Sequence, residues 1–321
     1  MSAPVNKSGD HPHAQALAVL AERALAGGRP MHEATVEESR AAQWAWLPYM
    51  GEPAPMADVR TRFIPAPTAE IPVTVYTPLG QGPFPALVMF HGGCWIVGNI
   101  DVADRPHRAL AEATGCVVVA VNYQKAPEHA FPVPLDDCYA AYTWTVAHAG
   151  ELGVDSARIG VCGDSAGGNL AAAVSLRARD TGGPAPAVQV LIYPAVDPNL
   201  ATASAQDYAE GFGLTTEDMR WSWRQYLQRP EHWENPWACP ALAASLTGLP
   251  PAVVVTAEFD VLRDEGSAYA DRLRRDGVPV THHEYAGAIH GFLWMGARVD
   301  DCRAMLNDIA GDLRTLWGNA E

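Results

Sequence analysis

The stretch VCGDSAGGNL, residues 161–170, places a serine among three glycines between an apolar run and a row of small residues. The run RIGVC at 158–162 is short enough for a buried strand, and a helix is expected from about 166 to 179. Residues 163–167 fit the pattern G-x-S-x-G. A serine on such a sharp strand-to-helix turn has an exposed Oγ, and the flanking glycines let neighbouring backbones pass. The motif therefore predicts a nucleophilic Ser165 at the end of a buried strand.

Short apolar runs alternate with helical patterns along most of the chain. Strands are expected at residues 71–77, 86–90, 116–123, 158–162, 188–193, 252–257 and 278–285. Helices are expected at residues 14–27, 135–148 and 166–179, before Gly277 and from about 300, with helical potential at 33–47. Such alternation indicates a mostly parallel sheet covered on both faces. Ligands bind such sheets at the carboxyl ends of the strands.

An insert at roughly residues 197–237 interrupts this alternation. Its helical part begins at the cap-like pair Thr215-Thr216. It contains four tryptophans: Trp221, Trp223, Trp233 and Trp237. Ordered excursions of this length are usually functional, so one interpretation is a lid that the insert forms with the N-terminal helices. The alternative is a helical insert whose tryptophans only pack on the core.

The serine needs a base, normally a histidine held by an acid, in the chain order Ser, acid, His on this kind of sheet. His290 follows the last expected strand in AGAIHGF, whereas His282 and His283 lie within that strand and point to opposite faces. We therefore expect His290 to be the base. For the acid we expect Asp260, after VVVTAEF, with Asp197, after VLIYPAV, as the alternative.

The stretch FHGGCW, residues 90–95, follows an expected strand and contains the pair Gly92-Gly93. Attack on an ester carbonyl creates an oxyanion, and each preorganised N–H donor there contributes about 3–4 kcal/mol. One donor is the residue after the nucleophile, here Ala166, and others come from a loop after an early strand. Gly92 and Gly93 fit that place. The alternative is an ordinary tight turn.

Composition excludes several classes of partner. The formal net charge is −15 and no run of Lys or Arg occurs, so nucleic acid and anionic membranes are poor partners. No apolar stretch approaches the roughly 18–20 residues of a membrane span, and the N-terminus lacks the apolar core of a signal peptide. Six cysteines without a CxxC pair indicate a reduced, cytoplasmic protein rather than a disulfide frame or zinc site.

The ordered motifs HGGCW, YQKAPEHAFP, GDSAGGNLA, DVLRDEG and HGF resemble the hormone-sensitive-lipase family of α/β-hydrolases, in its bacterial esterase branch. The similarity covers roughly residues 70–320. It implies an α/β-hydrolase fold: a mostly parallel central sheet flanked by helices, with a helical cap. It also implies a carboxylesterase for short-chain esters that needs no cofactor or metal.

The resemblance divides the chain into a catalytic domain and a cap. We expect cap segments at residues 1–55 and 197–237, and the catalytic domain at 56–196 and 238–321. The family also implies a possible homodimer through the last strand, around 278–285, with a monomer as the alternative.

Site residues carry over one position at a time. The matches are Ser165 for the nucleophile, Asp260 for the acid, His290 for the base, Gly92, Gly93 and Ala166 for the oxyanion donors, His91 for a brace of that loop, and Glu128 and Asp164 for structural positions. Further pocket candidates are Cys94, Trp95, Asp164 and Tyr193. Three departures stand out. Cys94 replaces a common third glycine, which makes acceptance of bulky or tertiary-alcohol esters doubtful, whereas Gln124-Lys125 (usually Arg-Leu) and Val261 (usually proline) concern the scaffold.

These observations predict a serine carboxylesterase that hydrolyses short- to medium-chain, small-molecule esters through an acyl-enzyme. An amidase or peptidase on the same fold is the alternative within enzymes. A non-catalytic small-molecule receptor is the alternative from another class, and it predicts a lost member of the Ser, Asp and His set. Because Ser165 occupies the turn, an aspartate nucleophile is disfavoured.

Overall fold

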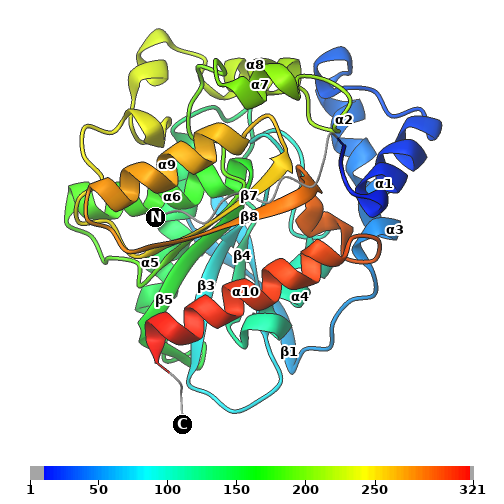
Figure 1. The fold of residues 1–321 in the computed structure, drawn as a ribbon. Helices are drawn as coiled ribbons and strands as arrows, with labels where there is room; N and C mark the ends of the chain where they lie inside the picture. Colours follow the sequence, from blue (N-terminus) through cyan, green and yellow to red (C-terminus); the bar gives the residue numbers. More distant parts are fainter. Residues whose placement is uncertain (1–10, 319–321) are drawn as a thin grey trace.

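One eight-stranded sheet forms the centre of the molecule, for which the computed structural model describes residues 11–318 (Figure 1). The strands are β1 (Asp58–Pro65), β2 (Glu70–Thr77), β3 (Phe84–Phe90), β4 (Val117–Val121), β5 (Val154–Asp164), β6 (Gln189–Ile192), β7 (Ala252–Phe259) and β8 (Val280–Ile289). Their order is β1-β2-β4-β3-β5-β6-β7-β8. Among the described strands, β2 alone runs against the others. The expected mostly parallel sheet is confirmed.

The two outermost strands, β1 and β8, differ from the sequence prediction. The edge strand β1 was not predicted, because its sequence DVRTRFIP mixes arginines with apolar residues and is largely exposed. The last strand, β8, continues to Ile289, four residues beyond the predicted end. As a result, His290 follows the strand directly, and no intervening loop is needed to bring it to the carboxyl edge of the sheet.

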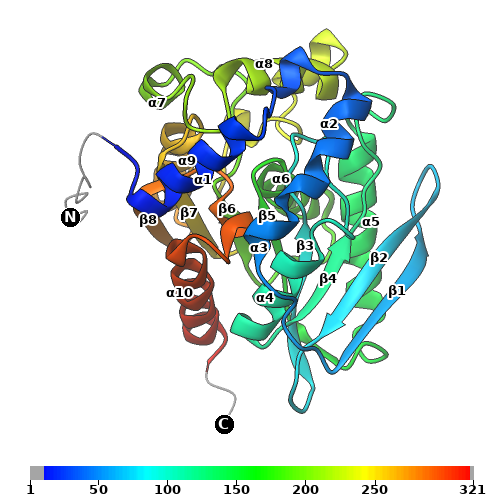
Figure 2. The same cartoon turned by 90° about the vertical axis from the view of Figure 1, so that its right-hand side faces the viewer.

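Helices cover both faces of the sheet (Figures 1 and 2). They are α4 (Asp104–Thr114), α5 (Val133–Ala147), α6 (Ala166–Thr181), α9 (Arg263–Arg275) and α10 (Asp300–Trp317). Helices α4 and α10 pack together on one face, and α5, α6 and α9 lie on the other. Helix α4 was not predicted, because its sequence DRPHRALAEAT is mostly polar and buries a short face that includes His107 and Leu110.

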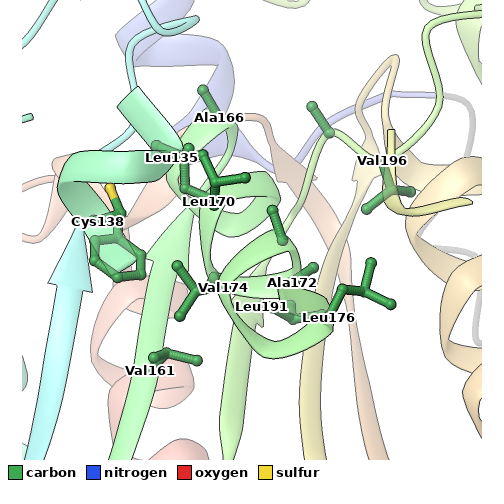
Figure 3. Close-up of a cluster of buried hydrophobic side chains, with 14 of the residues drawn as sticks. Leu135, Cys138, Val161, Ala166, Leu170, Ala172, Val174, Leu176, Leu191 and Val196 are labelled. Atoms are coloured by element: carbon green, nitrogen blue, oxygen red, sulfur yellow. The ribbon is translucent and has the colours of Figure 1, made fainter. Parts of the chain in front are cut away.

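Helix α6 is the most deeply buried of these helices, and it begins directly after Ser165. Figure 3 shows Leu170 and Val174 of α6 in one cluster with Val161 of β5. Small residues on α6 let it approach the sheet closely, and tight packing of this kind leaves side chains little freedom to shift. The start of α6 is therefore held firmly against the strand ends.

Two segments lie over the carboxyl end of the sheet, and we call residues 14–50 and 197–237 the roof segments (Figures 1 and 2). The first contains α1 (Ala14–Leu25), α2 (Val36–Ala42), α3 (Leu47–Met50) and the 3₁₀ turns η1 (Met31–Glu33) and η2 (Gln43–Trp46). The second contains α7 (Ala203–Asp207), α8 (Thr216–Tyr226) and η3 (Pro230–Glu234). Two further 3₁₀ turns are η4 (Pro240–Leu242) and η5 (Phe292–Met295). The predicted cap of α8 is present, because the Thr215 side chain accepts a hydrogen bond from the amide of Asp218.

The tryptophans of the second roof segment pack on their surroundings. Trp223 is fully buried against Trp95, with ring centroids 4.3 Å apart. Trp233 donates its Nε1–H to the carbonyl of Leu227. These two tryptophans therefore anchor the second roof segment to the rest of the molecule.

Candidate active site

Ser165 forms a strained turn between β5 and α6. Its backbone has φ +57° and ψ −119°, a conformation that costs a residue with a side chain about 1–3 kcal/mol. The flanking glycines permit the turn, because a side chain at Gly167 would collide with the backbone carbonyl of Phe90, and one at Gly163 with that of Gly167. The amide of Ser165 donates to the carbonyl of Ile192 at 2.8 Å, which fixes the turn to β6.

The structure brings the three predicted residues Ser165, His290 and Asp260 together. His290 Nε2 lies 3.0 Å from Ser165 Oγ, and His290 Nδ1 lies 2.7 Å from Asp260 Oδ2. The other carboxylate oxygen of Asp260 accepts the amide of Leu262 at 2.9 Å. The alternative acid, Asp197, instead accepts the amide of Asn199 within its own loop. The geometry therefore selects Asp260 over Asp197.

The two other histidines of β8 point away from the serine, to opposite faces as expected. His282 Nε2 lies 3.0 Å from Thr256 Oγ1, whereas His283 Nε2 lies 2.7 Å from Asp312 Oδ2 of α10. Both rings are thus engaged in packing the sheet.

The glycine pair after β3 differs from the prediction at one position. The amide of Gly92 donates to Asp164 Oδ1 at 2.8 Å, so this amide is already occupied and is not a free oxyanion donor. Among residues 11–318, no acceptor is found for the amides of Gly93 and Cys94. The amide of Ala166, in the first turn of α6, has no partner within the helix. Three amides thus remain available, with Cys94 in the place predicted for Gly92.

The loop that carries these amides turns sharply. Gly93 has φ +120°, and Cys94 and Trp95 follow at +56° and +61°. A side chain at Gly93 would also collide with the carbonyl of Val97. Positive φ at consecutive residues directs neighbouring N–H groups into one concave site, which suits an anion.

Asp164 ties three segments of the site together. Besides the Gly92 amide, its carboxylate accepts the indole N–H of Trp294 at 2.8 Å. Burial raises the pKa of Asp164, and the hydrogen bonds from Trp294 and Gly92 oppose this shift. Asp164, at the end of β5, thereby links this strand to the loop after β3 and to the 3₁₀ turn η5. Trp294 was missed by the sequence prediction, although its place four residues after His290 in HGFLW is a usable signal.

His91 supports the same loop from below. Its Nδ1 lies 2.7 Å from the carbonyl oxygen of Gly92, and its ring stacks on Tyr123 with centroids 4.5 Å apart. The hydroxyl of Tyr123 donates to the carbonyl of His91 at 2.8 Å. Burial lowers the pKa of His91 well below its usual range, so the ring is neutral. A neutral ring that donates from Nδ1 braces the loop without adding charge.

Three pocket candidates have different outcomes. Cys94 is buried and lines the cavity beside Ser165, and burial raises the pKa of its thiol to about 12. The thiol is therefore protonated, and unreactive as a nucleophile, near neutral pH. Trp95 was predicted to face the pocket, but it is fully buried and stacks on Tyr226 at 4.5 Å. That prediction is wrong, because the positive φ of Trp95 turns the ring toward α8.

Tyr193 is also buried away from the cavity. Its ring centroid lies 4.7 Å from that of His290 and 5.5 Å from that of Phe292. It therefore packs against the imidazole and restrains its orientation, and the prediction of a pocket-lining tyrosine is wrong.

A cavity of about 430 Å³ opens above Ser165 and His290. Its floor includes Gly93, Cys94 and Asp164, and its walls come from both roof segments. The first roof segment contributes Leu20, Arg23 and Trp46, which the sequence prediction missed. The available signal was the spacing of Val19 and Arg23, four apart on one face of the predicted helix.

The scaffold positions hold the first roof segment in place. Glu128 accepts two hydrogen bonds from Arg40 of α2, at 2.8 and 2.7 Å, and this pairing lowers the pKa of Glu128 to about 2. The amide of Gln124 donates to Asp137, and Lys125 donates to Asn122. These side chains are not among the residues that line the cavity.

A serine on a strained turn, a histidine within 3.0 Å of it and a buried aspartate behind the histidine define a serine hydrolase site on an α/β-hydrolase fold. The model of a family with the alpha/beta hydrolase fold matches residues 87–294. The chain belongs to this family, the hormone-sensitive-lipase-like α/β-hydrolases.

Characterised relatives and solved structures agree with this assignment. The "carboxylic ester hydrolase LipN" of Mycobacterium tuberculosis is 40% identical over 86% of this chain and 75% of its own length. An arylesterase of Saccharolobus solfataricus is 39% identical over 74% of this chain and 78% of its own. An ester hydrolase from the metagenome of Lake Arreo superimposes with a TM-score of 0.91 at 37% identity, covering 96% of this chain and all of that one. A thermostable esterase from Pseudomonas putida gives 0.91 at 35% identity, covering 96% and 98%.

Two negative findings concern residues 11–318. None of their helices is long and apolar enough to cross a membrane. They also contain no group of three or more His, Cys, Asp or Glu side chains arranged to hold a metal ion.

Proposed function

We propose that the protein is a serine carboxylesterase that hydrolyses short- to medium-chain carboxylic esters through an acyl-enzyme. One observation carries this proposal: Ser165, His290 and Asp260 are connected at 3.0 and 2.7 Å, next to three unoccupied amides. A non-catalytic receptor would not need the complete set. The relatives that are named ester hydrolases and esterases support the same conclusion.

The chemistry follows from the geometry. As Ser165 Oγ attacks the ester carbonyl, His290 Nε2 takes its proton. The negative charge that develops on the carbonyl oxygen is bound by the amides of Gly93, Cys94 and Ala166. His290 then protonates the departing alcohol. Water, activated by the same imidazole, releases the acid and restores the serine, while Asp260 stays ionised and keeps the proton of the ring on Nδ1.

In this proposal the cap consists of residues 1–55 and 197–237, which contain the two roof segments, and the rest of the chain is the catalytic domain. The position of α1 and α8 over one end of the sheet and the cavity walls they supply support this division. The first ten residues lie outside the described part. A cavity of about 430 Å³ suits a short or medium acyl chain. The rate on 4-nitrophenyl esters is expected to peak at or below about eight carbons; an optimum beyond about ten would indicate a lipase.

Substitution of Ser165 tests the proposal directly. Ser165→Ala is expected to reduce hydrolysis of 4-nitrophenyl butyrate to background, and to leave the circular dichroism spectrum and the melting temperature close to those of the wild type. Substantial remaining turnover in the folded variant would refute the assignment. An amide with the same acyl group, measured beside the ester, distinguishes an esterase from an amidase.

Two further features are part of the proposal. All six cysteines are unpaired and buried, which supports a reducing, cytoplasmic location. Strand β8 ends the sheet, and within residues 11–318 no further strand pairs with its outer edge, which supports a homodimer through this strand. Light scattering of the purified protein measures the mass, and the mass of one chain would refute the dimer.

A further inference from the structure

Arg23 of α1 is a cation without an anionic partner in the wall of the cavity. It is half-buried, and its guanidinium carbon lies 3.6 Å from the centroid of the Trp46 ring, which also lines the cavity. Among residues 11–318, no carboxylate lies within ion-pair distance of Arg23, and its guanidinium makes no hydrogen bond. Five N–H donors in a fixed planar arrangement therefore stand unused beside the site.

Two other arginines, one in the first roof segment and one beside it, have carboxylate partners. Arg40 pairs with Glu128 at 2.7 Å, and Arg298, which lies next to α1, pairs with Glu22 at 3.1 Å. Arg23 lies one residue after Glu22, yet that carboxylate is directed to Arg298 instead. Within residues 11–318, Arg23, the single arginine of α1, thus differs from Arg40 and Arg298 in having no carboxylate partner.

The acids of the cavity do not compensate for Arg23, because they have their own donors. Asp164 accepts hydrogen bonds from Gly92 and Trp294. Asp218 accepts the backbone amide of His32 at 3.0 Å and lies 2.9 Å from its Nδ1. Neither carboxylate is thus free to pair with the guanidinium. Arg29, which donates to the carbonyl of Glu33, adds a second positive charge to the rim.

The surroundings of Arg23 make this charge costly to leave unpaired. The other walls are largely apolar and include Val19, Leu20 and Met295. Burial lowers the pKa of Arg23 from its ordinary value, which agrees with a partly desolvated cation. A guanidinium in such a place binds a carboxylate through two parallel hydrogen bonds, and its stacking on Trp46 holds the planar group in one orientation.

We infer that the preferred substrate is an ester that carries a carboxylate on the part remote from the scissile bond, and that Arg23 binds this carboxylate. The inference rests on the proposed esterase function and adds a substrate class to it. The anion is recognised locally, because the chain as a whole, with a net charge of −15, repels anions at long range. The remote carboxylate lies either on the acyl part or on the alcohol part, and the two possibilities are separated by the choice of substrates.

Two pairs of esters test the inference, each with an anionic member and a neutral analogue. For the acyl side, 4-nitrophenyl hydrogen adipate is compared with 4-nitrophenyl methyl adipate. For the alcohol side, 4-acetoxybenzoate is compared with its methyl ester. Each kcat/KM is divided by the rate of alkaline hydrolysis of the same ester, so that intrinsic reactivity cancels. In the wild type, at least one pair is expected to favour the anionic member about tenfold or more at low salt.

Substitutions at Arg23 then locate the preference. Arg23→Gln is expected to reduce the anionic-to-neutral ratio by about tenfold or more, since a charge-assisted pair is replaced by a neutral amide. Arg23→Lys keeps the charge but not the planar fork, so its anionic-to-neutral ratio is expected to lie between that of the wild type and that of Arg23→Gln. Arg60→Gln is the control, because it removes the same charge from an arginine of β1 that is paired with Asp58 and does not line the cavity, and its ratio is expected to stay within about twofold.

The ratio separates recognition from a structural role. If Arg23 only packs on Trp46, the variants lower the rates on both members of a pair equally and the ratio stays constant, which overturns the inference. A wild type that prefers the neutral member of both pairs overturns it without any variant. In either case turnover of the neutral esters still depends on Ser165, so the esterase proposal stands or falls separately.

Discussion

The carboxyl end of the sheet and the two roof segments above it are built on different principles. At the sheet, Ser165, Asp260 and Asp164 are buried and each is held by hydrogen bonds from at least two segments of the chain. The roof segments are short helices joined by loops, and their link to each other includes a polar contact between His32 and Asp218. The first region is preorganised, and the second is adjustable.

This difference assigns separate tasks to the two regions. Electrostatic stabilisation of a transition state requires donors that do not move, so the chemistry belongs on the sheet. Recognition of the rest of the substrate tolerates exchange of side chains in the roof. Changes at the sheet should therefore alter kcat for all esters alike, and changes in the roof should alter KM and the preference among esters.

The largest effect is expected from Asp260→Asn. An amide at this position no longer fixes the proton of His290 on Nδ1, so kcat should fall about 10³–10⁴-fold for every ester tested. Steady-state kinetics on short and medium acyl chains measure this. Asp197→Asn is the control, because the side chain of Asp197 accepts a hydrogen bond from Asn199 of its own loop, and the kcat of this variant is expected to stay within about threefold. Equal losses in both variants would contradict the assigned acid.

A smaller effect is expected from His32→Ala. The substitution removes the ring contact to Asp218 and loosens the junction between the roof segments, so KM for 4-nitrophenyl butyrate should rise about threefold to tenfold while kcat changes little. His148→Ala, at the residue that follows α5 and lies outside the roof, is the control and should leave both constants unchanged. A fall in kcat with constant KM would mean that the junction supports the chemistry itself.

Cys94→Gly lies at the boundary between the two regions. It removes the thiol from the cavity floor but keeps the backbone amide, and glycine adopts the positive φ of this position without strain. The expected result is a gain of about threefold to fivefold in kcat/KM for tert-butyl acetate relative to ethyl acetate. An unchanged ratio would show that the thiol does not limit the size of the alcohol.

The smallest effect is expected from Glu128→Gln. Pairing with Arg40 lowers the pKa of Glu128 to about 2 in the folded state, so the carboxylate stabilises the fold above its unfolded pKa near 4.5. That contribution is lost as the pH falls from about 4.5 toward 2. Because the pair is exposed, it amounts to less than about 1 kcal/mol. Urea unfolding at pH 7 and pH 3 should show a difference between variant and wild type that shrinks at pH 3.

The sheet and the catalytic set were predictable because local rules govern them. The G-x-S-x-G turn needs glycines for steric reasons, and buried parallel strands are uniformly apolar, so both are visible in a single sequence. Helix α4 and strand β1 escaped prediction because charged and polar residues interrupt the apolar periodicity of both sequences. Contacts with other parts of the fold, rather than the local sequence pattern, therefore determine that these two elements form.

The details of the site depended on contacts between distant segments. Nothing local in HGGCW indicates that the Gly92 amide is taken by Asp164, 72 residues later in the chain. The position of Arg23 in the cavity wall likewise depends on its contact with Trp46. The orientation of the Trp95 ring, away from the cavity and toward α8, depends on its contact with Tyr226. A sequence identifies the residue types of the chemistry, and the partners that orient them appear only after folding.

Trp95 couples the position of the loop after β3, which carries the amides of Gly93 and Cys94, to the position of helix α8. Trp95 lies two residues after Gly93 in the chain, and its ring packs against the rings of Tyr226 and Trp223 of α8. Lifting α8 from the sheet would therefore extract this ring and displace the amides of Gly93 and Cys94. Withdrawal of α1 would leave those amides in place. For laboratory evolution of new specificities, α1 (Ala14–Leu25) is thus the segment to randomise first, whereas α2 should be kept, because Arg40 of α2 donates a hydrogen bond to the carbonyl of Ile96 in the loop after β3.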